Sequence, residues 1–286
     1  MKKFHKKAFS LVELSVIILI ISVVLLGVVK GNYLLSKSRL SNAQTLTQNS
    51  GILDIPDLVL WLETSLESSF VKSEAQDATN ISTWYNNQNI SPPNNASQSI
   101  VANQPKFYEN VFNGAIPAVR FDGNDDFLNF DGSNLLNTNY TVFVVEQRRS
   151  NKSTNYFIGG NSTSANNSNL AIGYRLNGTF TSTQYNNGVN ASIPSYGTPI
   201  PRIHVVSLSS VSGIGQRYWL NGILVASNIN QNRIFSFAGA ALGRYATSNF
   251  FNGDIGEVII FTRSLTTDER RSIENYLGKK YNIKVS

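Results

Sequence analysis

An almost unbroken apolar segment near the start of the chain constrains its architecture most. Residues 8–29 read AFSLVELSVIILIISVVLLGVV, and from Phe9 to Val29 the one charged side chain is that of Glu13. These twenty-one residues would form a helix about 30 Å long, which matches the hydrocarbon core of a bilayer. Four lysines, at positions 2, 3, 6 and 7, precede the segment. Because basic flanks stay in the cytoplasm, we expect everything after Val29 to lie outside it.

Two ordinary kinds of segment, a secretory signal peptide and a plain signal anchor, fit this stretch less well. The apolar run exceeds the usual length of a signal peptide's hydrophobic region, and no small-x-small cleavage site precedes Lys30. A plain anchor has no use for Glu13, because an ionised carboxylate costs about 2.5–3.5 kcal/mol at the centre of a membrane helix. We therefore expect Glu13 to have a partner.

The stretch KKAFSLVEL at residues 6–14, followed by an Ile/Val/Leu run, resembles the N-terminus of type IV prepilins and pseudopilins. The resemblance implies that a prepilin peptidase cuts between Ala8 and Phe9 and that the new amine of Phe9 is methylated. It also implies that Glu13 pairs with the Phe9 amine of a neighbouring subunit. Such a pair about 4 Å apart gains about 4 kcal/mol at an effective dielectric of 20, which offsets its burial. The family usually has glycine before the cut, where this chain has Ala8. A plain signal anchor remains the alternative.

The residues after Val29 turn polar but stay compatible with a helix, so a helix from Phe9 to about Gln48 would extend roughly 60 Å. Gly51, Asp54 and Pro56 mark its end. We expect three segments: a cytoplasmic leader at 1–8, a hydrophobic helix and stalk at 9–50, and a separate domain at 51–286. Leu35, Arg39, Asn42 and Leu46 would line one side of this helix, and only Leu35 and Leu46 are apolar, so we expect a partly exposed stalk.

The segment beyond residue 55 is predicted to be mostly β, because short β-rich runs alternate with Asn, Ser, Gly and Pro stretches and no helix intervenes. Asn221-Gly222 between two such runs predicts a type I′ hairpin. The run Thr141–Gln147 is typical of a central strand buried on both faces. A capping box, Thr266 with Glu269, opens a short C-terminal helix. Its apolar stripe is expected to consist of Ile273, Tyr276, Leu277 and Lys280.

Several phrases in this domain resemble bacterial laminin-G-like, concanavalin A-like domains. They include LWLE at 60–63, PAVRFDGNDDFL at 117–128 and GDIGEVIIF at 253–261, and the resemblance covers most of residues 55–283. It implies a β-sandwich jelly roll. Such folds include glycan-binding proteins, glycanases and structural modules, so the fold alone assigns no activity.

Neither an enzyme nor a nucleic-acid-binding protein is expected. Glycoside hydrolysis needs two carboxylates at a fixed separation, and the Glu-x-Asp-x-Glu spacing of related hydrolases does not occur. The acids of Thr141–Gln147 and Gly253–Thr262 are expected to be isolated, with Glu146 at a strand end and Asp254 three residues from Glu257. The formal net charge of +6 comes largely from the leader, so no basic patch for nucleic acid remains. The absence of cysteine excludes disulfides and thiolate metal sites.

The candidate ligand-binding residues are few. Asp122, Asn124, Asp125 and Asp126 offer closely spaced oxygen atoms for calcium, the one cofactor we consider, although the same residues suit a turn between strands. Trp84 beside a polar loop is a candidate for stacking on a sugar, although core packing is the commoner role. His204 lies in an apolar run and is expected to be a buried or edge residue, not a metal ligand.

These patterns predict a minor pilin-like or pseudopilin-like subunit of a type IV pilus or type II secretion filament. The chain would sit in the bacterial inner membrane, with its lectin-like domain outside the cytoplasm for adhesion or partner binding. Its expected partners are other pilin subunits, prepilin peptidase and a glycan or protein ligand. The alternative is a membrane-anchored extracytoplasmic glycan-binding protein that does not polymerise.

Overall fold

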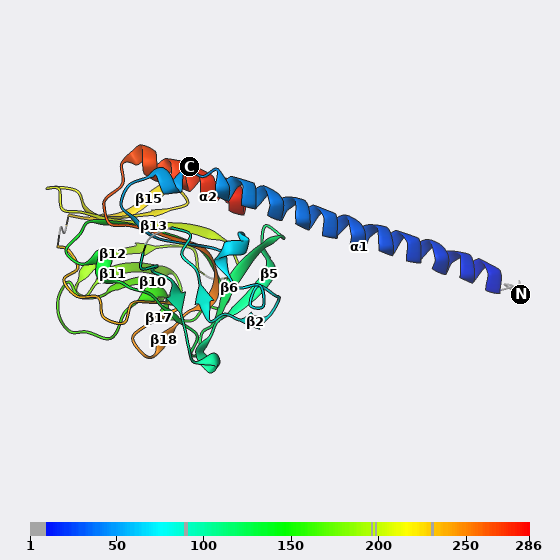
Figure 1. Cartoon of the computed structure of the whole chain (residues 1–286), viewed down its shortest axis with the longest axis horizontal. Coiled ribbons are helices and arrows are strands. Elements are labelled where there is room, and N and C mark those ends of the chain that lie inside the picture. The colour runs from blue at the N-terminus through cyan, green and yellow to red at the C-terminus, as the bar shows by residue number, and fades with distance from the viewer. Residues whose placement is uncertain (1–9, 89–90, 196, 198, 230–231) are drawn as a thin grey trace, which may run out of the picture.

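A long helix projects from a β-sandwich in the computed structural model (Figure 1). The structure describes residues 10–88, 91–195, 197, 199–229 and 232–286. Helix α1 (Leu11–Gln48) leads into the sandwich, and the short helix α2 (Thr267–Tyr281) closes the chain beside the base of α1. This arrangement confirms the predicted fold class: mostly β, with a long N-terminal helix and a short C-terminal one.

Two antiparallel sheets form the layers of the sandwich. The larger sheet has the order β15-β14-β13-β8-β19-β6-β5-β2, with β1 also paired to β19. Its strands are β1 (Leu58–Glu63), β2 (Thr79–Asn80), β5 (Lys106–Phe112), β6 (Ile116–Asp122), β8 (Tyr140–Arg148), β13 (Arg202–Ser209), β14 (Gly215–Leu220), β15 (Ile223–Asn228) and β19 (Asn252–Phe261).

The smaller sheet has the order β12-β11-β10-β9-β16-β7-β4-β3. Its strands are β3 (Thr83–Trp84), β4 (Ala96–Ser97), β7 (Leu128–Asn129), β9 (Asn155–Gly159), β10 (Leu170–Leu176), β11 (Thr179–Gln184), β12 (Asn187–Ser192) and β16 (Ala241–Leu242). A separate pair consists of β17 (Arg244–Tyr245) and β18 (Asn249–Phe250), and short 3₁₀ turns lie at Ile52–Asp54, Glu67–Ser69, Val101–Asn103 and Ser133–Leu135.

The main core fills the space between the sheets, and a second core lies on the outer face of the larger sheet. Strand β8 stands between β13 and β19 and every one of its residues is buried, which confirms the prediction of a central strand. The inner-facing Val142 and Val144 join the main core, while the outer-facing Phe143 and Val145 join the second. Both faces of β8 are therefore apolar, as its sequence indicates.

Two local predictions are also confirmed. Asn221 and Gly222 connect β14 to β15 with φ angles of +50° and +86°, as a type I′ turn requires. Helix α2 begins with the Thr266–Glu269 capping box. All members of its predicted stripe are buried against the second core.

Helix α1 has two halves with different surroundings. The large apolar side chains from Leu11 to Val29 are all exposed, by 42% to 86%. By length and composition α1 can cross a membrane, and none of its most apolar window is buried. The second half, from Ser36 onward, contacts the sandwich.

The side of the stalk that carries the weak apolar stripe is not the side that α1 buries most. Leu35 is 57% exposed, whereas Ala43 and Thr47 are buried. The residues facing the sandwich are Ser36, Leu40, Ala43 and Thr47. They are mostly small or polar, so α1 approaches closely and forms hydrogen bonds, and hydrophobicity alone does not mark this side.

Candidate functional site

The assembly segment begins at the first described residues. Ala8 and Phe9 lie outside the described part of the chain, so the cleavage and methylation sites remain predictions. The backbone N–H of Ser10 donates to Glu13 Oε2 at 2.8 Å, and the Glu13 N–H donates to Ser10 Oγ at 3.2 Å. Glu13 therefore caps its own helix, while its exposed side chain stays accessible to a neighbouring molecule.

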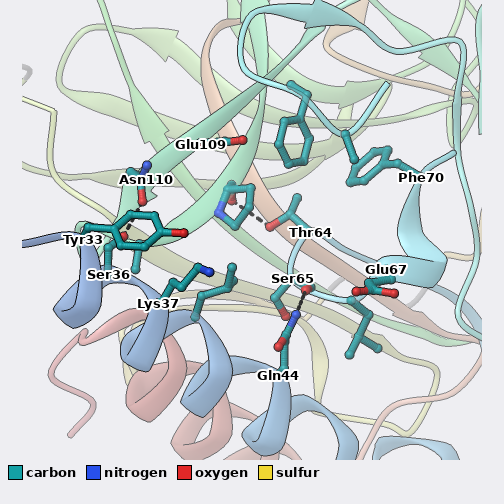
Figure 2. A pocket seen from close by; sticks show the side chains of 16 residues that line it. Tyr33, Ser36, Lys37, Gln44, Thr64, Ser65, Glu67, Phe70, Glu109 and Asn110 are labelled. Carbon is teal, nitrogen blue, oxygen red and sulfur yellow. Dashed lines mark hydrogen bonds between the residues drawn. The ribbon is translucent and has the colours of Figure 1, made fainter. Parts of the chain in front are cut away.

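A groove of about 440 Å³ separates the second half of α1 from the sandwich. Figure 2 shows Tyr33 and Lys37 of α1 on one side and Phe70 and Glu109 of the sandwich on the other. The Lys37 ammonium lies 4.8 Å from the centre of the Tyr33 ring. With aromatic rings and carboxylates in its lining, the groove could hold a group that is apolar at one end and polar at the other.

Hydrogen bonds hold α1 to the sandwich along this groove (Figure 2). The hydroxyl of Ser36 donates to Asn110 Oδ1 at 2.5 Å, and the amide of Gln44 donates to the Ser65 carbonyl at 2.9 Å. Arg39 Nη1 donates to the Asn113 carbonyl at 3.2 Å. The contacts of Ser36 and Gln44 lie more than one helical turn apart along α1. Together they fix the orientation of the helix relative to the sandwich.

A buried ionic cluster lies beneath the end of α1. Lys280 Nζ is 2.8 Å from Glu63 Oε2 and 2.9 Å from Glu257 Oε2, and all three side chains are fully buried. Burial acts to lower the pKa of Lys280, but the two carboxylates outweigh it and hold that pKa above its usual value. The expectation that the acids of Gly253–Thr262 are isolated is therefore wrong for Glu257.

The two carboxylates of this cluster have different surroundings. Burial raises the pKa of Glu257, and Lys280 offsets this only in part. Burial also acts to raise the pKa of Glu63, but Lys280 and the hydroxyls of Ser65 and Ser69 outweigh it and hold the pKa below its usual value. Glu257 thus binds a proton more readily than Glu63 does.

Tyr276 connects this cluster to α1. Its hydroxyl donates to Glu257 Oε1 at 2.9 Å and lies 3.1 Å from Thr47 Oγ1 of α1. Our sequence reasoning did not identify this cluster. Its one signal was Lys280 within the apolar stripe of α2, where a lysine needs a buried countercharge.

A second polar cluster lies in the main core. His204 is buried, as expected, and Glu146 lies 2.8 Å from its Nε2 atom. Tyr174 donates to the same carboxylate, and His204 Nδ1 is 3.0 Å from the Tyr218 hydroxyl. Burial lowers the pKa of His204 despite the neighbouring acid. With all four residues buried between the sheets, we interpret the cluster as structural.

The loop Asp122–Asp126 forms a turn between strands and also brings several carboxylate oxygens close together. The Asn124 N–H donates to Asp122 Oδ1 at 2.8 Å, and its side-chain amide donates to Oδ2 at 2.8 Å, as in a turn closed by an aspartate. Carboxylate oxygens of Asp122, Asp125 and Asp126 also lie within 4.8 Å of one another. Burial and the charge of Asp122 raise the pKa of Asp126 to about 7. Hard cations prefer such oxygen ligands, so calcium at these residues remains a prediction.

This loop borders a polar hollow of about 460 Å³ on the larger sheet. The Arg120 guanidinium lies 3.9 Å from the centre of the Tyr108 ring and pairs with the buried Asp254 at 2.6 Å. Lys106 and Asn80 also line the hollow. A stacked aromatic ring with amide and charged groups around it suits a polar ligand such as a sugar.

Trp84 is not available for stacking on a sugar. Its side chain is fully buried, its indole N–H donates to the Glu63 carbonyl at 2.8 Å, and its ring stacks on Phe70 with 5.8 Å between ring centres. The sequence-based prediction of a ligand contact is therefore wrong, and the commoner role in the core applies. Trp84 belongs to β3, and its side chain faces the main core. The neighbouring polar loop therefore does not expose the ring.

The fold is similar to that of solved sialidase structures. No protein-family profile matches the sequence, and no curated protein matches it. Trypanosoma rangeli sialidase in complex with sialic acid aligns with a TM-score of 0.53 at 12% identity, covering 82% of this chain and 35% of that one. Its covalent intermediate with 2,3-difluorosialic acid gives a TM-score of 0.55 at 11% identity, with the same coverage. A mutant of that enzyme displaying trans-sialidase activity gives 0.52 at 12% identity, covering 80% of this chain and 34% of that one. The chain thus spans about a third of the length of these enzymes, and the likeness is one of fold.

Proposed function

We propose that this chain is a minor pilin-like subunit that displays its β-sandwich domain on a type IV pilus or type II secretion filament. The observation that carries the proposal is the division of α1 into an exposed apolar half and a half bonded to the sandwich. Burying a large aliphatic side chain gains about 1.5–3 kcal/mol, so the exposed half requires an apolar environment. A bilayer provides it before assembly, and neighbouring helices provide it afterwards.

Glu13 favours assembly over simple anchoring. Its carboxylate stands one helical turn into the apolar half, next to the proposed cut before Phe9. The amine released by that cut would neutralise Glu13 of a neighbouring subunit when the helices pack together. On this proposal the chain resides in the bacterial inner membrane until assembly, its partners are prepilin peptidase and other pilin subunits, and it performs no catalysis.

A second function, glycan recognition, is supported by the hollow beside Tyr108 and by the likeness of the fold to about a third of a sialidase that was solved with sialic acid. It would be the task of the displayed domain under the first proposal. It would be the whole function if the chain were a membrane-anchored glycan-binding protein that does not polymerise.

Mass spectrometry of the mature protein and a Glu13→Gln variant test the assembly proposal. We expect a mature chain that begins with methylated Phe9. We expect Glu13→Gln to be processed but lost from sheared filaments, while Asp268→Asn, an exposed acid of α2, is incorporated normally. A chain that still begins at Met1, or equal incorporation of both variants, would contradict the proposal.

Glycan-array binding of the full chain in detergent tests the second function. A Lys106→Ser/Asn80→Ala double variant should bind its glycan at least tenfold more weakly, because both side chains line the hollow. The matched control is Lys72→Ser, which changes an exposed lysine elsewhere. Equal binding by the double variant and the control would exclude the hollow as the glycan site.

A further inference from the structure

The buried cluster around Lys280 holds an amine next to two carboxyl groups. These groups form ion pairs, and an amine and a carboxyl group can also condense to an amide. The Lys280 amine lies within 2.9 Å of an oxygen of each carboxylate, Glu63 and Glu257, and no part of the three side chains reaches solvent. Reactants held in this way can have effective concentrations of about 10⁵ M or more. Because solvent does not reach these side chains, hydrolysis of a bond formed between them is also disfavoured.

We propose that Lys280 and Glu257 form an intramolecular amide bond, with Glu63 as the base that takes up the proton of the lysine. This would be a modification site that joins α2 covalently to β19. It is independent of filament assembly.

The surroundings of Glu257 fit the role of the carboxyl group that is attacked. Its Oε1 atom accepts hydrogen bonds from Trp61 Nε1 at 2.7 Å and from the Tyr276 hydroxyl at 2.9 Å. Two fixed donors on one oxygen stabilise the negative charge that develops there when an amine adds to the carbon. The other oxygen, Oε2, is the one beside Lys280, and it is the oxygen that leaves.

The surroundings of Glu63 fit the role of the base. Its Oε1 accepts from the Leu66 N–H at 2.7 Å and the Ser69 hydroxyl at 2.6 Å, and its Oε2 accepts from the Ser65 N–H at 2.8 Å. These donors hold the carboxylate in place beside Lys280. Glu63 is therefore oriented to receive a proton, while burial raises the pKa of Glu257, which favours its protonated form.

The reaction balances with water as its one by-product. The Lys280 ammonium first passes a proton to Glu63, and the free Nζ then adds to Cδ of protonated Glu257. As Nζ adds, the π electrons of the Cδ=Oε1 double bond move onto Oε1. They form the double bond again when the Cδ–Oε2 bond breaks. One further proton moves from Nζ to the departing Oε2 hydroxyl, which leaves as water. The product is a neutral amide with one N–H, and Glu63 keeps the first proton.

Peptide mass spectrometry of the full chain, purified in detergent, tests the proposal. Trypsin cuts after Arg244, Arg263, Lys279 and Lys284. The bond would therefore appear as one branched peptide joining residues 245–263 to 280–284. Its mass would be about 18 Da below the sum of the two, the mass of the water lost. Two unjoined peptides with cleavage after Lys280, or a branch to residues 40–72 that contain Glu63, would overturn the proposal.

A Glu63→Gln variant tests the assignment of the base, because it keeps both reactants and removes the proton acceptor. We expect the branched peptide to fall at least tenfold in a variant that remains folded by circular dichroism. Asp268→Asn should form the bond as the original chain does. A folded Glu63→Gln protein with undiminished branching would exclude Glu63 as the base. If the variant is unfolded, the branched peptide of the original chain still decides whether the bond exists.

Discussion

Lys280 illustrates how single residues hold a helix against the sandwich in this protein. It enters the second core from α2 and meets Glu63 of β1 and Glu257 of β19. A buried charge is tolerated only with partners that replace its hydration. The three charges come from α2, β1 and β19, so one cluster joins these elements, and α2 in turn contacts α1.

Lys280→Met should lower the free energy of unfolding by at least about 3 kcal/mol, because it leaves the buried carboxyl groups of Glu63 and Glu257 without the lysine that both contact. The matched control is Lys279→Met, which changes an exposed lysine one position earlier in the same helix. Urea denaturation of both variants measures the difference. Equal stability of the two would show that the cluster contributes little to folding.

Asp126 should make stability depend on pH. Its pKa in the folded protein is about 7, above its ordinary value of 3.8, because of burial and the charge of Asp122. Between these two values the folded state binds the proton more tightly than the unfolded chain does. The free energy of unfolding therefore falls as the pH rises from about 4 to 7.

Asp126→Asn removes this titration, so the variant should melt at a higher temperature than the original chain at pH 8 and show little difference at pH 4. Asp125→Asn, at the exposed neighbour, serves as the control. Melting curves without divalent cations measure the effect. An equal rise for both variants at pH 8 would point to general charge repulsion in the loop.

At the scale of elements, the features that neighbouring residues encode could be predicted. The span of α1, the capping box of α2, the Asn221-Gly222 turn and the burial of β8 all follow from local sequence patterns. The partners of distant residues could not be predicted in this way. Glu63 and Lys280 are 217 residues apart, and no spacing in the sequence indicates that β1 and α2 bring them together.

The side of α1 that contacts the sandwich could not be predicted for a related reason. Helical periodicity identifies apolar stripes, but this interface uses Ala43, Thr47 and Ser36, which are small or polar. The hydroxyl of Thr47 bonds to Tyr276 at 3.1 Å and lies 3.4 Å from Ser65 Oγ. Polar contacts of this kind become visible only when both surfaces are known.

Thr47→Val should loosen the junction between α1 and α2. The change keeps the shape of the side chain but leaves the buried Tyr276 hydroxyl with one partner fewer, at a cost of about 1–3 kcal/mol. Thr45→Val is the control, because Thr45 is exposed and its hydroxyl bonds only within α1. Limited proteolysis between residues 49 and 57 should be faster for Thr47→Val alone. Identical cleavage rates would mean that this bond does not hold α1 in place.

For the whole molecule, the described residues divide at about Val29 into a part that requires an apolar environment and a part that does not. Upstream of this point, α1 buries none of its most apolar window. Downstream, α1 completes the second core with the buried Ala43 and the partly buried Leu46. The stalk therefore belongs energetically to the sandwich, although the sequence places the domain boundary near Gly51.

Two truncated chains should separate these contributions. A chain of residues 30–286 should be water-soluble and should melt at nearly the same temperature as the full chain, because the described residues that it loses, 10–29, are all exposed. A chain of residues 51–286 exposes the apolar surface that Ala43 and Leu46 cover and loses the bonds of Thr47 and Gln44. Its melting temperature should fall by several degrees, since each kcal/mol is worth about 2–4 °C at this size. Calorimetry of both chains in one buffer measures this, and equal melting temperatures would place the boundary of the folding unit at Gly51 instead.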